Sequence, residues 1–237
     1  MTAAFGAACS LALVLLVGCG VVGDLPAATG AVGGTAPTGS EAPVDGAAAR
    51  LLLEQLEVKG RAPKTGYSRE QFGPVWADVD SDGCDSRNQL LQRRLTNVQL
   101  LPGTKGCVVM SGDLAEPYIP RTIHFVRDGA YVNAVDLDHV VSLSDSWQKG
   151  AQQLGPVQRE QFANDPMNLL ATDPSANRQK GDSDAASWLP RNKAFRCEFV
   201  STQISVKAKY GLWVTAAERD AMSRVLDGCP SSPPGVG

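Results

Sequence analysis

The chain changes character near residue 46, and this change determines which part of it can fold. An apolar run from Leu11 to Gly18 is shorter than the roughly 20 residues that cross a bilayer, and it has the length of a signal-peptide core. Residues 20–46 are mostly Gly, Ala, Pro, Thr and Val without helical or strand period, so they cannot bury enough apolar surface to become ordered. We expect a signal peptide over 1–18, a disordered tether over 19–46, a folded domain over 47–230 and a flexible tail over 231–237.

The end of the apolar run indicates how the exported chain is held. Residues Leu16-Val17-Gly18-Cys19 resemble the lipobox of bacterial lipoproteins, in which small residues precede a cysteine that becomes the lipid-bearing N-terminus. The resemblance implies a lipoprotein signal peptide, lipidation of Cys19 and anchoring on the outer face of the cell membrane. The alternative is an ordinary signal peptide that is cut after a small residue and releases a secreted protein.

Four cysteines remain in the folded region, an even number in an exported chain, and this favours two disulfides. Of the three connectivities, we favour Cys84 with Cys107 and Cys197 with Cys229, because each pair closes a local loop. A zinc site of four thiolates is disfavoured, since zinc ligands usually come in close CxxC-type pairs and no two of these cysteines are that near.

Composition limits both the size of the fold and the kind of ligand it can bind. With 43% hydrophobic residues among 237, the chain can bury one sizeable core. A net charge of −3 excludes nucleic-acid binding through a global basic field, so any such binding must be local. Apolar periodicity predicts an α+β fold that begins with a helix near Ala47. The other predicted helices are residues 88–98, 145–153, 157–162, 175–180, 193–210 and 216–226, the predicted strands are 107–110, 122–126, 130–137 and 167–172, and Arg127-Asp128-Gly129 is a predicted hairpin turn.

The chain contains two histidines, so at most two residues can supply an imidazole base. His124 lies in an alternating strand, where a structural or surface role is the commoner one. His139 follows Asp138 at a strand end, and adjacent side chains leave a strand on opposite faces. One of these two residues can therefore bind a metal while the other handles a proton. A Ser-His-Asp hydrolase is disfavoured because the chain has no GxSxG elbow.

Three short segments resemble the ββα-metal (His-Me finger) site of HNH endonucleases: Asp138-His139-Val140-Val141, Asn168-Leu169-Leu170 and Asn177-x-x-Lys180-Gly181-Asp182. Residues 66–230 resemble more closely the secreted actinobacterial HNH proteins with a DUF1524, or GmrSD C-terminal-like, domain. The HNH domain of RNA-guided CRISPR nucleases has the same order, with a shorter insertion. The resemblance implies a small β-hairpin or sheet with several helices around a ββα-metal core at about residues 130–182. The further stretches that carry it are residues 67–69, 83–88, 144–150, 162–165 and 188–190.

Carried over residue by residue, the resemblance assigns a role to each member of the pattern. His139 would be the general base that activates water, and Asp138 and Asn177 would be ligands of one divalent metal. Asn168 would hold the loop and the imidazole, and Lys180 would place a positive charge near a phosphate oxygen. Carboxylate and amide oxygens suit Mg²⁺ or Mn²⁺ rather than zinc, and this chain has Asn177 where the HNH pattern has its third histidine.

Two arginines and an acidic run extend the list of candidate ligand-binding residues. Arg178 and Arg87 are candidate phosphate ligands, although Arg87 alternatively pairs with Asp85 or Asp82 to hold its loop. The carboxylates of Asp78, Asp80 and Asp82 match the opening of a calcium loop, whose twelfth position is Gln89 rather than Glu. Trp147, Trp188 and Trp213 are predicted to lie in the core or to dock helices rather than to stack on bases.

These observations together predict an exported, lipid-anchored and monomeric endonuclease. It would hydrolyse phosphodiester bonds of DNA, or of RNA, with one divalent metal and His139 as the base. The alternative is a non-catalytic binding lipoprotein of the cell surface that retains the fold.

Overall fold

The computed structural model describes residues 45–127 and 134–230. The signal peptide, Cys19, nearly all of the tether, the Asp128-Gly129 turn and the tail lie outside these residues, so the predictions made for them are not tested. Within the described ranges, no helix combines the length and the apolar character needed to cross a membrane.

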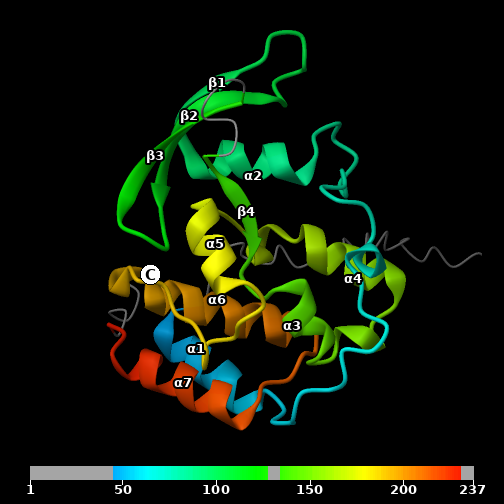
Figure 1. The fold of residues 1–237 in the computed structure, drawn as a ribbon, viewed down its shortest axis with the longest axis vertical. Helices are drawn as coiled ribbons and strands as arrows, with labels where there is room; N and C mark the ends of the chain where they lie inside the picture. Colours follow the sequence, from blue (N-terminus) through cyan, green and yellow to red (C-terminus); the bar gives the residue numbers. More distant parts are fainter. Residues whose placement is uncertain (1–44, 128–133, 231–237) are drawn as a thin grey trace, which may run out of the picture. The chain divides into compact units, whose positions relative to one another are not determined.

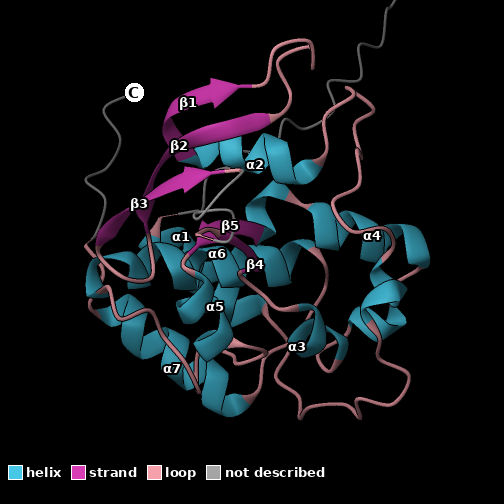
Figure 2. Cartoon of the chain, turned by 45° about the horizontal axis from the view of Figure 1, so that its top comes forward, coloured by secondary structure: helices cyan, strands magenta, loops and turns pink. Residues whose placement is uncertain are grey.

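The described fold consists of helices around two small antiparallel sheets, which agrees with the predicted α+β class (Figures 1 and 2). Strands β1, β2 and β3 form one sheet in that order, and β4 pairs with β5 in the other. The strands are β1 (Leu95–Leu100), β2 (Val109–Glu116), β3 (Arg121–Val126), β4 (Asp136–His139) and β5 (Leu169–Thr172). The α-helices are α1 (Gly46–Gln55), α2 (Ser86–Arg94), α3 (Leu143–Trp147), α4 (Pro156–Asn164), α5 (Pro174–Lys180), α6 (Arg196–Lys209) and α7 (Ala216–Asp227). Short 3₁₀ turns are η1 (Arg69–Phe72), η2 (Ala151–Gln153), η3 (Pro166–Asn168) and η4 (Lys193–Phe195).

Side-chain caps explain where several helices begin. The carboxylates of Asp45, Asp85 and Asp173 accept hydrogen bonds from the first turns of α1, α2 and α5. Thr215 forms a capping box with Glu218 at the start of α7. These caps satisfy backbone donors that a helix leaves unpaired at its N-terminus.

Three of the predicted elements are wrong in part. The helix predicted over 88–98 ends at Arg94, and the next six residues form β1, in which Leu95 lies opposite Leu114 of β2. The pairing with β2 satisfies the backbone there and overrides the local helical pattern. The hairpin predicted between 122–126 and 130–137 is also wrong, because β3 pairs with β2 whereas β4 pairs with β5. The helix predicted over 145–153 is interrupted at Gly150, whose φ of 122° no helix accommodates.

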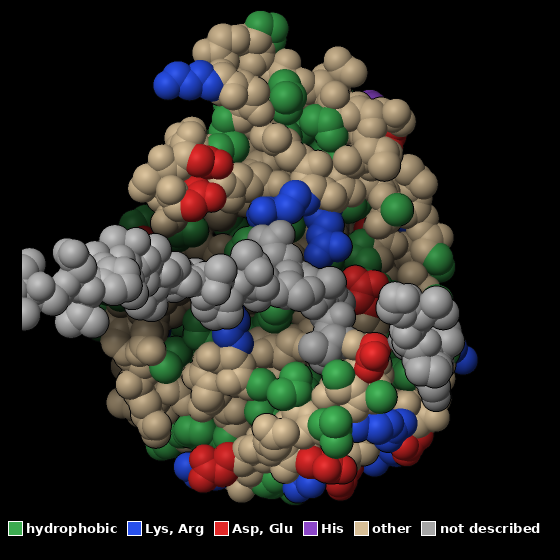
Figure 3. Space-filling model, turned by 180° about the vertical axis from the view of Figure 1, so that it is seen from behind, with side chains coloured by type: hydrophobic (Ala, Val, Ile, Leu, Met, Phe, Trp, Pro, Cys, Tyr) green, Lys and Arg blue, Asp and Glu red, His purple; other side chains and the backbone are tan. Residues whose placement is uncertain are grey.

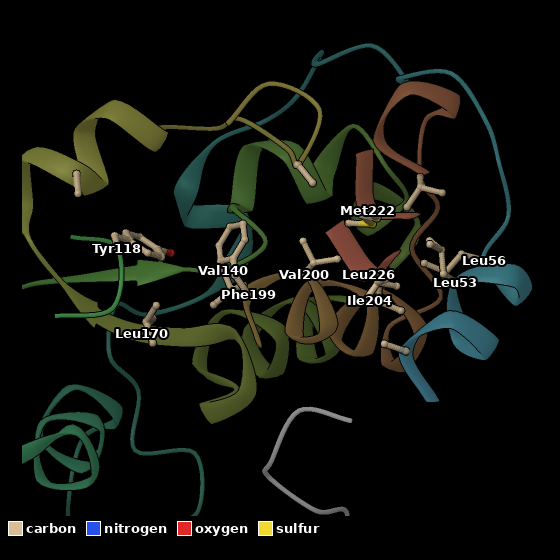
Figure 4. Close-up of a cluster of buried hydrophobic side chains, with 14 residues drawn as sticks. Leu53, Leu56, Tyr118, Val140, Leu170, Phe199, Val200, Ile204, Met222 and Leu226 are labelled. Carbon is tan, nitrogen blue, oxygen red and sulfur yellow. The ribbon is translucent and has the colours of Figure 1, made fainter. Parts of the chain in front are cut away.

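The core has separate regions on the two sides of the β4–β5 pair. On one side, α1, α6 and α7 pack their apolar faces together with Tyr118, Val140 and Leu170 (Figure 4). On the other side, α2 lies between the three-stranded sheet and β5, with Leu90 and Leu91 fully buried. Both faces of β4 and β5 are therefore covered, which holds the end of β4 in a fixed position.

Two disulfides close local loops, and their pairing confirms the prediction. Cys84 is bonded to Cys107 with 5.3 Å between Cα atoms, and Cys197 is bonded to Cys229 with 5.7 Å. The first ties the start of α2 to the segment before β2, and the second ties α6 to the end of α7. All four thiols of the folded region are used, which removes the zinc alternative.

Candidate active site

Strands β4 and β5 and helix α5 follow one another in the ββα order that the sequence predicts. His139 lies opposite Leu169 and Asp138 opposite Leu170 in the antiparallel register. Asp173 caps α5 directly after β5, and Gly181, with φ of 54°, ends the helix one residue after Lys180. The 29 residues between β4 and β5 form α3, η2, α4 and η3. The long insertion is therefore structured, and the three elements still come together.

His139 is the buried histidine of the pair, with 7% of its surface exposed. Its Nε2 lies 2.8 Å from the carbonyl oxygen of Ala163. Because a carbonyl only accepts hydrogen bonds, Nε2 carries the proton and the neutral ring keeps its lone pair on Nδ1. Burial, assisted by the positive charges of Arg69 and Lys180, lowers the pKa of His139 to about 4. The imidazole is therefore an uncharged proton acceptor at neutral pH.

A recess opens beside the His139 ring, and its wall includes two residues that the sequence did not single out. The indole of Trp76 lies parallel to the imidazole, with ring centroids 6.3 Å apart and planes within 9°. Trp76 has a φ of 56°, rare for a residue other than glycine, and the next amide, of Ala77, donates to Asn164 Oδ1 over 3.0 Å. The second of these two residues in the wall is Arg69. The full lining is Arg69, Phe72, Gly73, Pro74, Val75, Trp76, His139, Leu143, Ala163 and Asn164.

Asp138 points to the opposite face of β4, as the alternation of a strand predicts. Its Oδ1 accepts from Lys180 Nζ over 2.9 Å, and its Oδ2 accepts from the Tyr118 hydroxyl over 2.6 Å. Burial raises the pKa of Asp138, and Lys180 and Tyr118 oppose this shift. Tyr118 was not predicted, because it lies in the loop after β2, 20 residues before its partner.

Lys180 does not lie where its predicted contact with a phosphate would require. Only 1% of its surface is exposed, and its ammonium also donates to the carbonyl oxygen of His139 over 2.8 Å. The single lysine thus binds both residues of the Asp138-His139 pair. This geometry supports a role in positioning the strand end rather than direct contact with substrate.

Asn168 holds the chain where it leaves β4. Its Oδ1 accepts from the Val141 amide over 2.8 Å, and its Nδ2 donates to the carbonyls of Val141 and Phe162, each over 3.3 Å. Its own carbonyl accepts from Val140. Asn168 therefore fastens the loop, as predicted. It does not contact the imidazole directly. It binds the carbonyl of Phe162, and the carbonyl of the next residue, Ala163, accepts the hydrogen bond from His139.

Asn177 is half-buried on α5, one turn before Lys180 and so on the same helix face. Its amide oxygen and the Asp138 carboxylate form a donor set made of oxygen alone, which suits Mg²⁺ or Mn²⁺ completed by water and phosphate oxygens. Lys180 and Tyr118 each occupy one lone pair of the carboxylate, and each carboxylate oxygen has another. The residues therefore fit a hard divalent cation in the type of their donor atoms.

The remaining candidates occupy the surroundings of this site. Arg87 is half-buried, and the burial and the neighbouring Arg127 lower its pKa, against the nearby charges of Asp136 and Asp85. Among the described residues it forms no ion pair, so its alternative role as a partner of Asp85 or Asp82 is not observed. Arg178 is exposed on α5.

The acidic run and the three tryptophans have structural contacts. The carboxylates of Asp78, Asp80 and Asp82 gather within 4.8 Å of one another, and the side-chain amide of Gln89 donates to two of them. The predicted helix-docking role of the tryptophans agrees with the packing: Trp147 lies against Phe72, Trp188 against Tyr118, and Trp213 donates to a backbone carbonyl.

Comparison with known protein families shows to which family the chain belongs. The family model described as "GmrSD restriction endonucleases, C-terminal domain" matches residues 85–225, which include β4, β5 and α5. The chain belongs to this family. An "Uncharacterized secreted protein" of Arthroderma benhamiae is 38% identical over 183 residues, which cover 76% of this chain and 84% of the relative. No solved structure matches the chain.

Membership of the GmrSD C-terminal family agrees with the resemblance found in the sequence, and it implies an HNH-like nuclease fold. The family is named for restriction endonucleases, whose substrate is nucleic acid, and HNH-like nucleases generally use a divalent metal. The secreted relative and the two disulfides are consistent with an extracellular protein.

Proposed function

We propose that the protein is an exported, lipid-anchored endonuclease that hydrolyses phosphodiester bonds of DNA with one Mg²⁺ or Mn²⁺. The observation that carries the proposal is His139, a buried neutral imidazole at the end of β4 whose Nε2 is bound to a backbone carbonyl. A general base needs a free lone pair and a fixed orientation, and His139 has both. Family membership supplies the nucleic-acid substrate.

Each residue of the site has a separate task in this reaction. His139 Nδ1 accepts the proton of the attacking water. Lys180 and Asn168 keep the strand end and the loop beneath it in place through their backbone contacts. Asp138 and Asn177 are the residues that would hold the cation, which when bound supplies positive charge for the phosphate oxygen and the leaving group. Because Asp138 and His139 leave β4 on opposite faces, the phosphate would lie across the end of the strand.

Plasmid nicking measured over a range of Mn²⁺ concentrations tests the metal ligands. Asp138→Asn keeps an oxygen that can bind Tyr118 but loses the charge, and Asn177→Ala loses a neutral ligand. We expect both variants to need more Mn²⁺ for half-maximal cleavage, with the larger shift for Asp138→Asn. Asp113→Asn, which changes a half-buried carboxylate on β2 away from the site, is the matched control.

Two results would contradict the proposal. The metal assignment fails if Asp138→Asn and Asn177→Ala, both folded, cut like the parent at low Mn²⁺. Nuclease activity itself fails if the parent chain leaves both supercoiled plasmid and single-stranded DNA intact with Mg²⁺ or Mn²⁺, or cuts equally well in EDTA. If both forms of DNA stay intact, the result favours the alternative, a binding lipoprotein that keeps the fold without catalysis.

A further inference from the structure

The side chains that line the recess beside His139 suit a single phosphate and a single base of a nucleic acid chain. Apart from the histidine, the one charged side chain in its lining is Arg69, and no carboxylate lines it. Arg69 is exposed and has no hydrogen bond or ion pair within residues 45–127 and 134–230. Its charge nevertheless acts on His139. A single unpaired guanidinium near the base is suited to one phosphate group.

The rest of the lining is apolar and aromatic. Trp76 presents an indole, and the neighbouring Val75 has 68% of its surface exposed. The positive φ of Trp76 and the bond from Ala77 to Asn164 set the backbone that carries the ring. An aromatic ring held at the edge of an apolar recess can stack on a nucleobase, but only on a base whose face is open. The bases of a duplex are stacked on one another and do not offer that face.

The distribution of charge over the molecule also favours a single strand over a duplex. Proteins that bind duplex DNA through its backbone neutralise many phosphates with Lys and Arg. On the face shown in Figure 3, basic and acidic side chains occur in small groups among other residues, and the whole chain has a net charge of −3. His139 is also only 7% exposed, so a phosphate must lie close against the mouth of the recess to approach it. A flexible single strand can bend against such a site more readily than a stiff duplex can.

We propose that the mouth of this recess binds one nucleotide unit of single-stranded DNA, with the phosphate at Arg69 and the adjoining base against Trp76. The inference rests on the proposed nuclease function and adds the form of its substrate. It makes Arg69 a substrate-binding residue and Trp76 a stacking platform, in addition to the residues of the ββα pattern.

Binding is measured first, in EDTA, so that the result does not depend on cleavage. The probe is a fluorescein-labelled oligodeoxynucleotide, single-stranded or annealed to its complement, and the full chain is titrated while anisotropy is followed. We expect the single strand to bind at least about tenfold more tightly than the duplex, because only its bases are open for stacking. Equal or tighter binding of the duplex would overturn the inference.

Variants then assign the two residues. Arg69→Ala should weaken single-strand binding and make the slope of log K against log salt shallower by about 0.7, the value for one lost phosphate contact. Trp76→Ala should weaken binding about 5- to 100-fold, while Trp76→Phe should keep most of it. Arg50→Ala is the control, because Arg50 lies on α1 in an exposed pair with Asp227.

Cleavage by the same proteins separates this inference from the proposed function. We expect Arg69→Ala and Trp76→Ala to raise KM more than they lower kcat, with melting temperatures near that of the parent. If His139→Ala abolishes cleavage while both recess variants bind and cut like the parent, the recess inference is wrong and the nuclease stands. If the parent binds the single strand as expected but never cuts, the nuclease proposal is wrong. If Trp76→Ala does not fold, Arg69→Ala decides the case: weaker single-strand binding with the shallower salt slope supports the inference, and binding and slope like those of the parent overturn it.

Discussion

Lys180 connects the two residues on which the site depends. From α5 its ammonium reaches the carboxylate of Asp138 and the carbonyl of His139, and all three groups are nearly inaccessible to solvent. A buried ion pair is weak evidence of net stabilisation, but removal of one partner leaves the other charge uncompensated. The pair therefore ties the position of the proposed base to the helix that carries Asn177.

This arrangement predicts a large and specific loss of stability. Lys180→Met should lower the free energy of unfolding by about 3–5 kcal/mol, because Asp138 is then buried without its cation. Arg178→Ala, an exposed change on the same helix, should alter it by no more than about 0.5 kcal/mol. Urea denaturation followed by circular dichroism measures both. A loss below about 1 kcal/mol for Lys180→Met would show that the buried pair is not maintained in solution.

Among the site residues, the sequence predicts those that belong to a short local motif. It does not predict those that tertiary contacts bring to the site from distant parts of the chain. Asp138 and His139 were predicted from adjacent letters, and the opposite directions of their side chains followed from strand geometry. Trp76 and Tyr118 carry no comparable signal. Trp76 reaches His139 from 63 positions earlier, by a turn whose left-handed conformation depends on a bond from Ala77 to Asn164. Such contacts depend on tertiary packing, which no local pattern of residues encodes.

Between the helices, away from the candidate site, five buried charges and the exposed Arg61 form a second group. Three basic and three acidic side chains meet there, so their formal charges cancel. Lys149 lies at its centre, 2.8 Å from Asp145, 2.8 Å from Asp184 and 2.6 Å from Glu218. Through these contacts α3 and α7 are joined to the segment after α5. The members are Arg61, Asp145, Lys149, Asp184, Lys207 and Glu218.

This group makes stability depend on pH in a defined window. Burial raises the pKa of Asp184, but Lys149 and Arg61 outweigh it and bring the value to about 2, against 3.8 ordinarily. Because the folded pKa is the lower one, the stabilisation is complete above about pH 4 and is lost as pH falls toward 2. The parent should lose about 2 kcal/mol more than Asp184→Asn between pH 5 and pH 2. Urea unfolding at both pH values measures this, and equal losses would contradict it.

At the scale of elements, most helices were predictable because their apolar faces repeat with the helical period. The predictions over 157–162, 175–180 and 216–226 agree with α4, α5 and α7. The strand pairing was not predictable from the apolar pattern: residues 95–100 become β1 only through β2. The pairing of β4 with β5, 30 positions away, followed only from the resemblance to the ββα site. The apolar period of a segment indicates whether it is a helix or a strand, but it does not indicate which distant strand it pairs with.

The cysteines indicate where the whole molecule acts. The two disulfides of the described residues fit an oxidising compartment, as does the name of the secreted relative. The remaining proposal is the lipid on Cys19, which would keep the nuclease at the cell surface rather than free in the medium. It concerns a position outside the described residues and needs its own test.

We expect Cys19→Ala to move the protein from the detergent phase to the aqueous phase in a phase-partition experiment. The physical reason is that a diacyl anchor supplies two hydrocarbon chains to the bilayer. The folded domain should keep its melting temperature, which serves as the control for structure. Identical partition of the parent and Cys19→Ala would count against lipidation.

The central claim is that His139 is the general base of a metal-dependent nuclease, and the chain supplies its own matched control. His124 is the other histidine, and it is exposed on β3 with Nδ1 2.7 Å from Asp113. The decisive measurement is the rate of cleavage of single-stranded DNA and of supercoiled plasmid in saturating Mn²⁺ for the parent, His139→Ala and His124→Ala. We expect a loss of about 10²- to 10⁴-fold for His139→Ala, which extra metal does not restore, and an unchanged rate for His124→Ala. Equal rates for the parent and a folded His139→Ala would contradict the claim.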